Sequence, residues 1–422
     1  MKTTTGLRVL LMASAALGFA GCATAQTPEA QFTSPDAVEQ KADESFSAWT
    51  ARFMEEAVSR GYSQDLVSTA FAGVVHPDPV VVDRSESQPE FVRPVWEYLN
   101  SAVSESRVAS GQAELSAQPE LFAGLEAEYG LDREVLTAIW GLESAFGQIL
   151  GDYDVFRSLA TLGWAGWRPD FVEEQLFAAL DILRDGEATR DQLKGSWAGA
   201  MGQTQFIPAS YRIYAQDWDG DGRKNIWSDD GDALASAANL LAKSGWKQDV
   251  PWGVEVRLTD EFNWDMFDGQ ERLTANWAQG GVARADGAQW GTDLWGLDAE
   301  LILPAGAQGP AFLTFSNFDA IMRYNNSTAY ALAVGMLSDV YAGRGGLVAD
   351  WPDEGRPLRR AEVYELQDSL TALGFDTQGS DGLIGPNTRK AVRAFQRANA
   401  ITPDGHVNSD LLDRVRAAEP IQ

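Results

Sequence analysis

Two residue types that often carry cross-links or metal sites are nearly absent from this 422-residue chain. It has one cysteine, Cys22, and two histidines, His76 and His406. A single cysteine excludes a disulfide within the chain, and two histidines exclude a histidine-rich zinc site. Basic residues are also fewer than acidic ones. The chain has 33 Lys and Arg and 61 Asp and Glu, which gives a formal net charge of −28. Such a chain repels polyanions, so we exclude nucleic acid as a partner.

No apolar run is long enough to span a bilayer as a stable helix. Residues 1–22 are instead predicted to be a secretion signal, because Lys2 and Arg8 precede an apolar run. The run ends in Phe-Ala-Gly-Cys at 19–22, which resembles a bacterial lipobox, whose cysteine is diacylated. We expect Cys22 to anchor the chain through its diacylglycerol to the outer membrane, facing the periplasm. The alternative is ordinary cleavage after Ala25 and simple secretion.

The rest of the chain divides by composition. Residues 23–44 are small and polar and are predicted to be a tether. Residues 45–346 form a large domain, residues 347–357 form a linker marked by Pro and Gly, and residues 358–418 form a separate small helical module. The sequence identifies no protein partner.

The large domain changes character along its length. Residues 46–71 and 92–250 show mostly helical periodicity. Residues 254–258 alternate like a strand, and the glycine-rich stretch 270–312 predicts short strands and loops. Residues 313–341 are predicted to return to helix. The fold class is therefore α+β but mainly α, with a small β-containing insertion and a separate C-terminal module.

One carboxylate stands where an apolar side chain is expected. Residues 131–151 are predicted to be one helix, with Asp132 as its N-cap and Gly151 as its stop. Glu143 falls inside the apolar arc of that helix. The other members of the arc are Val135, Leu136, Ile139, Leu142, Phe146 and Leu150. A buried carboxyl group usually escapes the cost of its charge by a raised pKa, which suits a general acid. The alternative is a structural Glu paired with an arginine or capping a loop.

Three segments favour the catalytic interpretation. They are WGLESAFG at 140–147, KGSWAGAMGQTQFIPASY at 194–211 and MRYNNS at 322–327. In this order they resemble the membrane-bound lytic murein transglycosylase B family, glycoside hydrolase family 103. The resemblance implies a lysozyme-like catalytic core, with Glu143 as the catalytic residue.

The resemblance also implies the residues that contact substrate. Ser196 is expected near the catalytic carboxylate and the N-acetyl group, and Gln205 beside the cleaved bond. Tyr324 and Asn325 match contacts on the far side of the site. Arg168 falls where the family carries a pair of arginines, of which this chain has one.

The implied reaction cleaves peptidoglycan between N-acetylmuramic acid and N-acetylglucosamine and leaves a 1,6-anhydromuramic end. Most glycosidases use two carboxylates. Glu143 is the one acidic residue within the three segments, although a second of the 61 acidic residues could fold nearby. The resemblance implies that Glu143 acts first as acid and then as base, with no cofactor for catalysis. Two alternatives stay open: a hydrolytic muramidase on the same fold, and a non-catalytic peptidoglycan-binding lipoprotein.

An acidic loop follows the central segment. Asp217, Asp219 and Asp221 fit the first half of an EF-hand loop, in which the backbone carbonyl of Arg223 would be the next ligand. Position twelve is a serine, and the family carries a late aspartate ligand, for which Asp232 is our choice over Asp229 and Asp230. We expect a structural calcium site. The alternative is an acidic turn without metal.

The last module contains an amphipathic helix over 359–373 and an Asp-Gly turn at 381–382 that is partly repeated at 404–405. This pattern resembles the type 1 peptidoglycan-binding domain, which implies a three-helix module. The alternative is a generic helical cap. Peptidoglycan is therefore the expected partner, and the module would hold the enzyme on its polymer.

Overall fold

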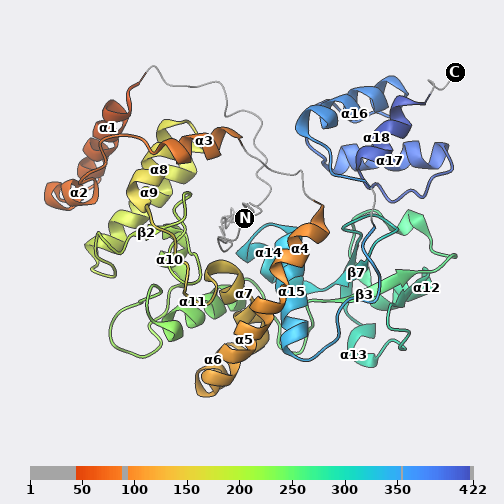
Figure 1. Cartoon of the computed structure of the whole chain (residues 1–422), viewed down its shortest axis with the longest axis horizontal. Helices are drawn as coiled ribbons and strands as arrows, with labels where there is room; N and C mark the ends of the chain where they lie inside the picture. The colour runs from red at the N-terminus through yellow and green to blue at the C-terminus, as the bar shows by residue number, and fades with distance from the viewer. Residues whose placement is uncertain (1–43, 88–93, 353–354, 419–422) are drawn as a thin grey trace, which may run out of the picture. The chain divides into compact units, whose positions relative to one another are not determined.

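The computed structural model describes residues 44–87, 94–352 and 355–418 (Figure 1). The expected signal sequence, most of the tether and Cys22 lie outside these residues. The chain forms two compact units. Of the described residues, one unit comprises 44–87, 105–248 and 320–341, and the other comprises 94–104, 249–319, 342–352 and 355–418.

The first unit is helical, apart from a two-stranded antiparallel ribbon of β1 and β2. The long helix α15 lies against α7 and α5 (Figure 1). Most of its residues are buried, as expected for a helix that is apolar on nearly all sides. The elements are α1 (Phe46–Ser59), α2 (Gln64–Ala70), α3 (Pro79–Ser87), α5 (Glu105–Ala117), α6 (Pro119–Tyr129), α7 (Arg133–Ser144), β1 (Tyr153–Asp154), α8 (Val155–Trp164), α9 (Pro169–Arg184), β2 (Lys194–Gly195), α10 (Pro208–Tyr214), α11 (Asp230–Lys243) and α15 (Thr328–Tyr341). Helix α14 (Ser316–Tyr324) crosses the boundary between the units.

The second unit contains a five-stranded antiparallel sheet in the order β4-β6-β7-β3-β5. Its core includes Val256, Trp277 and Leu313. The elements here are α4 (Val95–Ala102), β3 (Gly253–Leu258), η1 (Trp264–Met266), β4 (Arg272–Leu273), α12 (Thr274–Gln279), β5 (Val282–Arg284), α13 (Thr292–Trp295), β6 (Asp298–Ile302) and β7 (Ala311–Thr314). The C-terminal module of the same unit consists of α16 (Arg360–Ala372), α17 (Pro386–Ala398) and α18 (Ser409–Arg416), packed around Leu366, Val392 and Phe395.

The mainly helical fold class with a small sheet is confirmed, and the strand predicted at 254–258 is β3. Three details of the prediction are wrong. Residues 313 and 314 belong to β7, because both pair with β3 and with β6 before the chain turns into α14. The glycine-rich stretch contains two short helices, α12 and α13. The helix predicted over 131–151 ends at Ser144. Among the described residues, no helix has both the length and the apolar character needed to cross a bilayer.

Candidate active site

The helix that carries Glu143 ends abruptly one residue later. Ala145 and Phe146 have left-handed backbones with φ of 50° and 61°, and Gly147 follows at 77°. The Phe146 ring then folds back onto Trp140, edge to face at 5.5 Å. Gly141 makes room for that ring, because a Cβ there would lie 2.7 Å from it. Two successive left-handed non-glycine residues are unfavourable by about 1–2 kcal/mol each and are typical of functional sites. Glu143 therefore stands on the last turn of α7.

The carboxyl group of Glu143 is buried, with 1% of the residue exposed. The hydroxyl of Tyr330, on α15, donates a 2.6 Å hydrogen bond to Glu143 Oε1. Tyr330 is itself 3% exposed. The sequence analysis missed this residue, although it lies shortly after the MRYNNS segment. A tyrosine in an apolar helix is ordinarily a core residue, so periodicity gives no signal for its contact with the acid.

Tyr324 joins the late segment to the central one. Its hydroxyl donates a 2.6 Å hydrogen bond to the backbone carbonyl of Thr204, and its ring stacks on that of Tyr330 at 6.4 Å. Burial, and then the nearby charge of Glu143, raise the pKa of Tyr324 well above its usual value. The tyrosine therefore stays protonated and remains a donor.

Asn325 is the one expected contact residue whose buried polar atoms lack hydrogen-bond partners in the described part of the chain. It is 1% exposed, and neither its side-chain oxygen nor its nitrogen has a partner. Leaving a buried amide unsatisfied costs about 1–3 kcal/mol. Such an exception calls for an explanation, and a ligand that supplies the missing partners is one.

The central segment is a tight backbone turn built on small residues. Ser196 N donates to Ala200 O at 2.7 Å. Gly195 is required here, because a Cβ on it would lie 1.8 Å from that same carbonyl oxygen. The Ser196 hydroxyl accepts a 3.0 Å hydrogen bond from Ala200 N, so this side chain stabilises the turn between Ser196 and Ala200. Gln205, with φ of 48°, donates from its side chain to Leu150 O and Gly202 O at 3.1 and 2.8 Å.

Gln203 links this turn to helix α7. Its Oε1 accepts from Trp140 Nε1 at 2.8 Å, and its Nε2 donates to Asp230 Oδ1 at 2.9 Å. Gln203 is 3% exposed. The sequence places Gln203 within the central segment but gives no signal for this contact. Gln203 joins α7, the central segment and the start of α11.

Arg168 precedes α9 with a left-handed backbone of φ 41°. Its guanidinium lies over the rings of Phe171 and Trp167 at 4.5 and 5.5 Å. Burial lowers the pKa of Arg168, which nonetheless stays charged. The aromatic pair holds its side chain in place.

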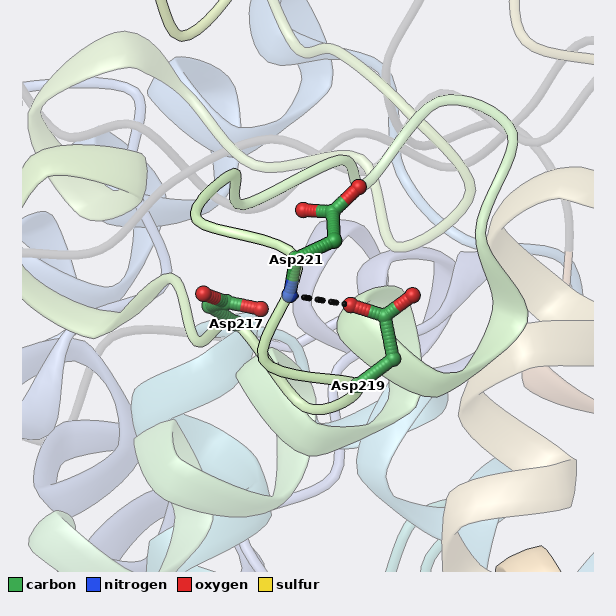
Figure 2. A group of neighbouring side chains, drawn as sticks. All are labelled: Asp217, Asp219 and Asp221. Atoms are coloured by element: carbon green, nitrogen blue, oxygen red, sulfur yellow. Dashed lines mark hydrogen bonds between the residues drawn. The ribbon is translucent and has the colours of Figure 1, made fainter.

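The acidic loop brings three carboxylates together. Ligand atoms of Asp217, Asp219 and Asp221 lie within 4.8 Å of one another, and all three residues are exposed. Figure 2 shows them on one loop, with Asp221 N donating to Asp219 Oδ1 at 2.9 Å. Three converging carboxylates are a donor set that suits a hard cation such as calcium.

Asp232, the expected late ligand, lies outside the cluster of three carboxylates. Asp232 is 1% exposed, and its two oxygens accept 2.6 Å hydrogen bonds from Trp218 N and Asn225 N. Burial raises the pKa of Asp232 while these two bonds oppose the rise. Asp232 therefore accepts hydrogen bonds from backbone near both ends of the acidic loop, and it is not one of the three clustered carboxylates.

Comparison with known families decides the assignment. Residues 45–339 match the model of the transglycosylase SLT domain, and residues 359–415 match that of the putative peptidoglycan binding domain. This chain belongs to the transglycosylase SLT-domain family.

The chain is similar to a named curated protein and to several solved structures. It is 34% identical over 221 residues to membrane-bound lytic murein transglycosylase B of Escherichia coli strain K12, an alignment that covers 51% of this chain and 58% of the relative. It is 47% identical to SltB3 from Pseudomonas aeruginosa, solved in complex with NAG-anhNAM-pentapeptide, with a TM-score of 0.85 over 88% of this chain and 100% of that one. It is 25% identical to Escherichia coli Slt35 in complex with calcium, with a TM-score of 0.60 over 74% and 98% of the two chains.

Proposed function

We propose that this SLT-domain protein is a lytic murein transglycosylase that cleaves the β-1,4 bond between N-acetylmuramic acid and N-acetylglucosamine in peptidoglycan. The observation that carries the proposal is the buried Glu143 carboxyl group, held by the Tyr330 hydroxyl at 2.6 Å. The likeness to SltB3, whose solved complex contains an anhydro-muramyl product, supports the same reaction here.

The proposed reaction needs one residue in two sequential roles. Glu143 first gives its proton to the glycosidic oxygen, and the bond to C1 breaks. The N-acetyl group of the muramic residue shields the cationic C1. Glu143, now ionised, takes the proton of the C6 hydroxyl, whose oxygen bonds to C1. Atoms balance without water, and the carboxyl group ends protonated as it began.

The chain's other residues would position the sugar. The unsatisfied amide of Asn325 is the best placed by its chemistry, since an amide can both donate to and accept from an N-acetyl or hydroxyl group. Gln205 and Ser196 already make internal hydrogen bonds, so we assign them to shaping the central turn as well as to substrate contact.

A hydrolytic muramidase would use the same acid but would need a second carboxylate or a positioned water. A pure peptidoglycan binder would gain nothing from a buried acid, whose burial is costly. The test is digestion of purified sacculi by the unsubstituted chain and by Glu143→Gln. The first should release soluble muropeptides and the second should bind sacculi without releasing them. Undiminished release by Glu143→Gln contradicts the proposal.

The acidic loop is proposed to hold a structural calcium ion through Asp217, Asp219 and Asp221. When bound, the ion would offset the repulsion of three adjacent carboxylates. The indole of Trp218, next to the first ligand, packs close to Gly124 and Gly231, which lie in α6 and α11. The loop is thereby tied to the scaffold that also holds Gln203 through Asp230.

The chain is also proposed to act in the periplasm as a lipoprotein of the outer membrane, through a diacylated Cys22. The lipobox-like sequence and the membrane-bound relative support this placement. Labelling with radioactive palmitate should mark the wild-type chain and not Cys22→Ala. Equal labelling of both would contradict lipidation.

A further inference from the structure

The C-terminal module contains the same recognition unit twice. Helices α16 and α17 carry the pattern Arg-x-x-Val-x-x-apolar-Gln at 360–367 and 389–396. Each is followed by an Asp-Gly pair, at 381–382 and 404–405. We call these the first and second Gln/Asp-Gly units.

The two units have matching hydrogen bonds. Gln367 Nε2 donates to Asp381 Oδ1 at 2.8 Å, and Gln396 Nε2 donates to Asp404 Oδ1 at 2.7 Å. The glutamine oxygens accept from the glycines, Gly382 N at 2.9 Å and Gly405 N at 2.8 Å. In both units the carboxylate is thus fixed through Oδ1, so that Oδ2 has a set direction.

Each glycine also lies under the side chain at the fifth position of the helix pattern. A Cβ on Gly382 would lie 2.5 Å from the Tyr364 ring, and one on Gly405 would lie 3.1 Å from the Arg393 guanidinium. The two units therefore share an arrangement in which a fixed aspartate lies next to a glycine that is covered by the side chain from the fifth helix position.

The second Gln/Asp-Gly unit is occupied by a backbone segment from the same compact part of the fold. Ala307 N, in the loop between β6 and β7, donates to Asp404 Oδ2 at 2.9 Å. The preceding Gly306 lies so close that a Cβ would come within 2.8 Å of that oxygen. Arg393 lies 5.9 Å from the Phe267 ring centre. This half of the module thus binds a peptide N–H through the second aspartate oxygen.

The first unit presents the same surface to solvent. Asp381 and Arg360 are exposed, and Tyr364 is 37% exposed, unusually high for a ring in this chain. Within the described module, the hydrogen bonds to the Asp381 carboxylate go to Oδ1. The Arg360 guanidinium lies over the Tyr364 ring at 5.8 Å, so an aromatic face, a cation and a directed carboxylate oxygen adjoin.

We propose that the first unit binds the stem peptides of peptidoglycan in the way the second binds Ala307. A stem amide N–H donates to Asp381 Oδ2, the Tyr364 ring packs beside the peptide, and Arg360 pairs with a stem carboxylate. The inference rests on the proposed function only for the identity of the polymer. The peptide is favoured over the glycan because the occupied copy holds a peptide backbone.

The test uses the full chain with Glu143→Gln, so that sacculi are not digested during the measurement. Binding is measured by co-sedimentation with intact sacculi and with sacculi stripped of stems by an amidase. Asp381→Asn keeps the oxygen that accepts from Gln367 Nε2 and replaces Oδ2 with an NH2 group. Because this group is a hydrogen-bond donor, it cannot accept from a peptide N–H. We expect at least a tenfold weaker affinity of Asp381→Asn for intact sacculi, and no difference between the chains on stripped glycan.

Asp410→Asn, which neutralises another exposed aspartate of the module, is the matched control and should bind intact sacculi as the parent does. If Asp381→Asn lowers the melting temperature, Tyr364→Ala and Arg360→Gln replace it and should weaken binding to intact sacculi alone. Unchanged affinity of all three variants overturns the proposal. An equal loss on stripped glycan assigns the surface to sugar and also overturns it. Failure of the proposed function is seen separately, as absence of anhydro products from the unsubstituted chain.

Discussion

The hydroxyl of Tyr330 donates a 2.6 Å hydrogen bond to Oε1 of Glu143, although 187 positions separate the two residues. The bond joins the first turn of α15 to the last turn of α7. It fixes one carboxyl oxygen and so directs the other. A carboxyl group that must give and then take a proton at two different oxygens of a sugar gains from a fixed orientation.

Tyr330→Phe tests this positioning role. The ring and its stacking on Tyr324 are kept, and the bond to Glu143 is lost. We expect kcat to fall on the order of 10- to 100-fold with KM nearly unchanged, measured as release of soluble muropeptides against sacculus concentration. A loss confined to KM, or none at all, would show that the bond is merely structural.

Tyr341→Phe is the matched control. Tyr341 lies on the same helix, and its hydroxyl donates to the backbone carbonyl of Arg107 at 3.1 Å. This substitution removes a buried hydrogen bond of similar kind away from Glu143. We expect a small loss of stability, about 1 kcal/mol, and wild-type kcat.

Asn325→Leu separates substrate binding from folding. The amide has no hydrogen-bond partner among the described residues, so an apolar side chain of similar size should leave stability unchanged or increase it. Activity should nevertheless fall, with a raised KM. Melting temperature and steady-state kinetics on the same preparation are the measurements.

Asn317→Leu gives the opposite expectation. Asn317 is fully buried on α14, and its amide donates to Val250 O at 2.5 Å. Its replacement leaves a carbonyl unsatisfied and should destabilise the chain by about 1–3 kcal/mol. If Asn325→Leu destabilises as much as Asn317→Leu does, the ligand role of Asn325 is contradicted.

Gly195→Ala tests the central turn. The new methyl group would lie 1.8 Å from Ala200 O, a backbone atom that cannot move without breaking its bond to Ser196 N. We expect a loss of about 1–3 kcal/mol in the free energy of unfolding, measured by urea denaturation, together with loss of activity. Gly296→Ala has nothing within 4 Å of its Cβ and should be neutral, and an equal loss there would refute the steric argument.

Calcium should raise the melting temperature of the full chain, relative to the same protein in a chelator. The gain reaches about 2.7 kcal/mol at a calcium concentration about 100 times Kd. Asp219→Asn should reduce it, whereas Asp260→Asn, an exposed carboxylate elsewhere in the chain, should not. An unchanged melting temperature of the wild-type chain on calcium addition would contradict the proposed calcium site.

The parts of this account that the sequence predicted were those with a local signal. The helices with a 3.6-residue period, the alternating strand β3 and the carboxylate of Glu143 in an apolar arc can each be recognised within a short stretch of sequence. Tyr330, Gln203 and the role of Asp232 were missed because each depends on a partner far along the chain. The end of α7 at Ser144 was missed for a related reason. Ala145 and Phe146 have left-handed backbones where the Phe146 ring packs against Gly141 and Trp140, and local propensity does not predict such a packing contact.

The most direct test of the central claim is the mass of the glycan ends. Purified sacculi are digested with the unsubstituted chain, and the muropeptides are analysed by mass spectrometry without prior reduction. We expect 1,6-anhydromuramic ends from the unsubstituted chain and none after incubation with Glu143→Gln. Reducing muramic ends, heavier by one water, would make the enzyme a hydrolase and contradict the account.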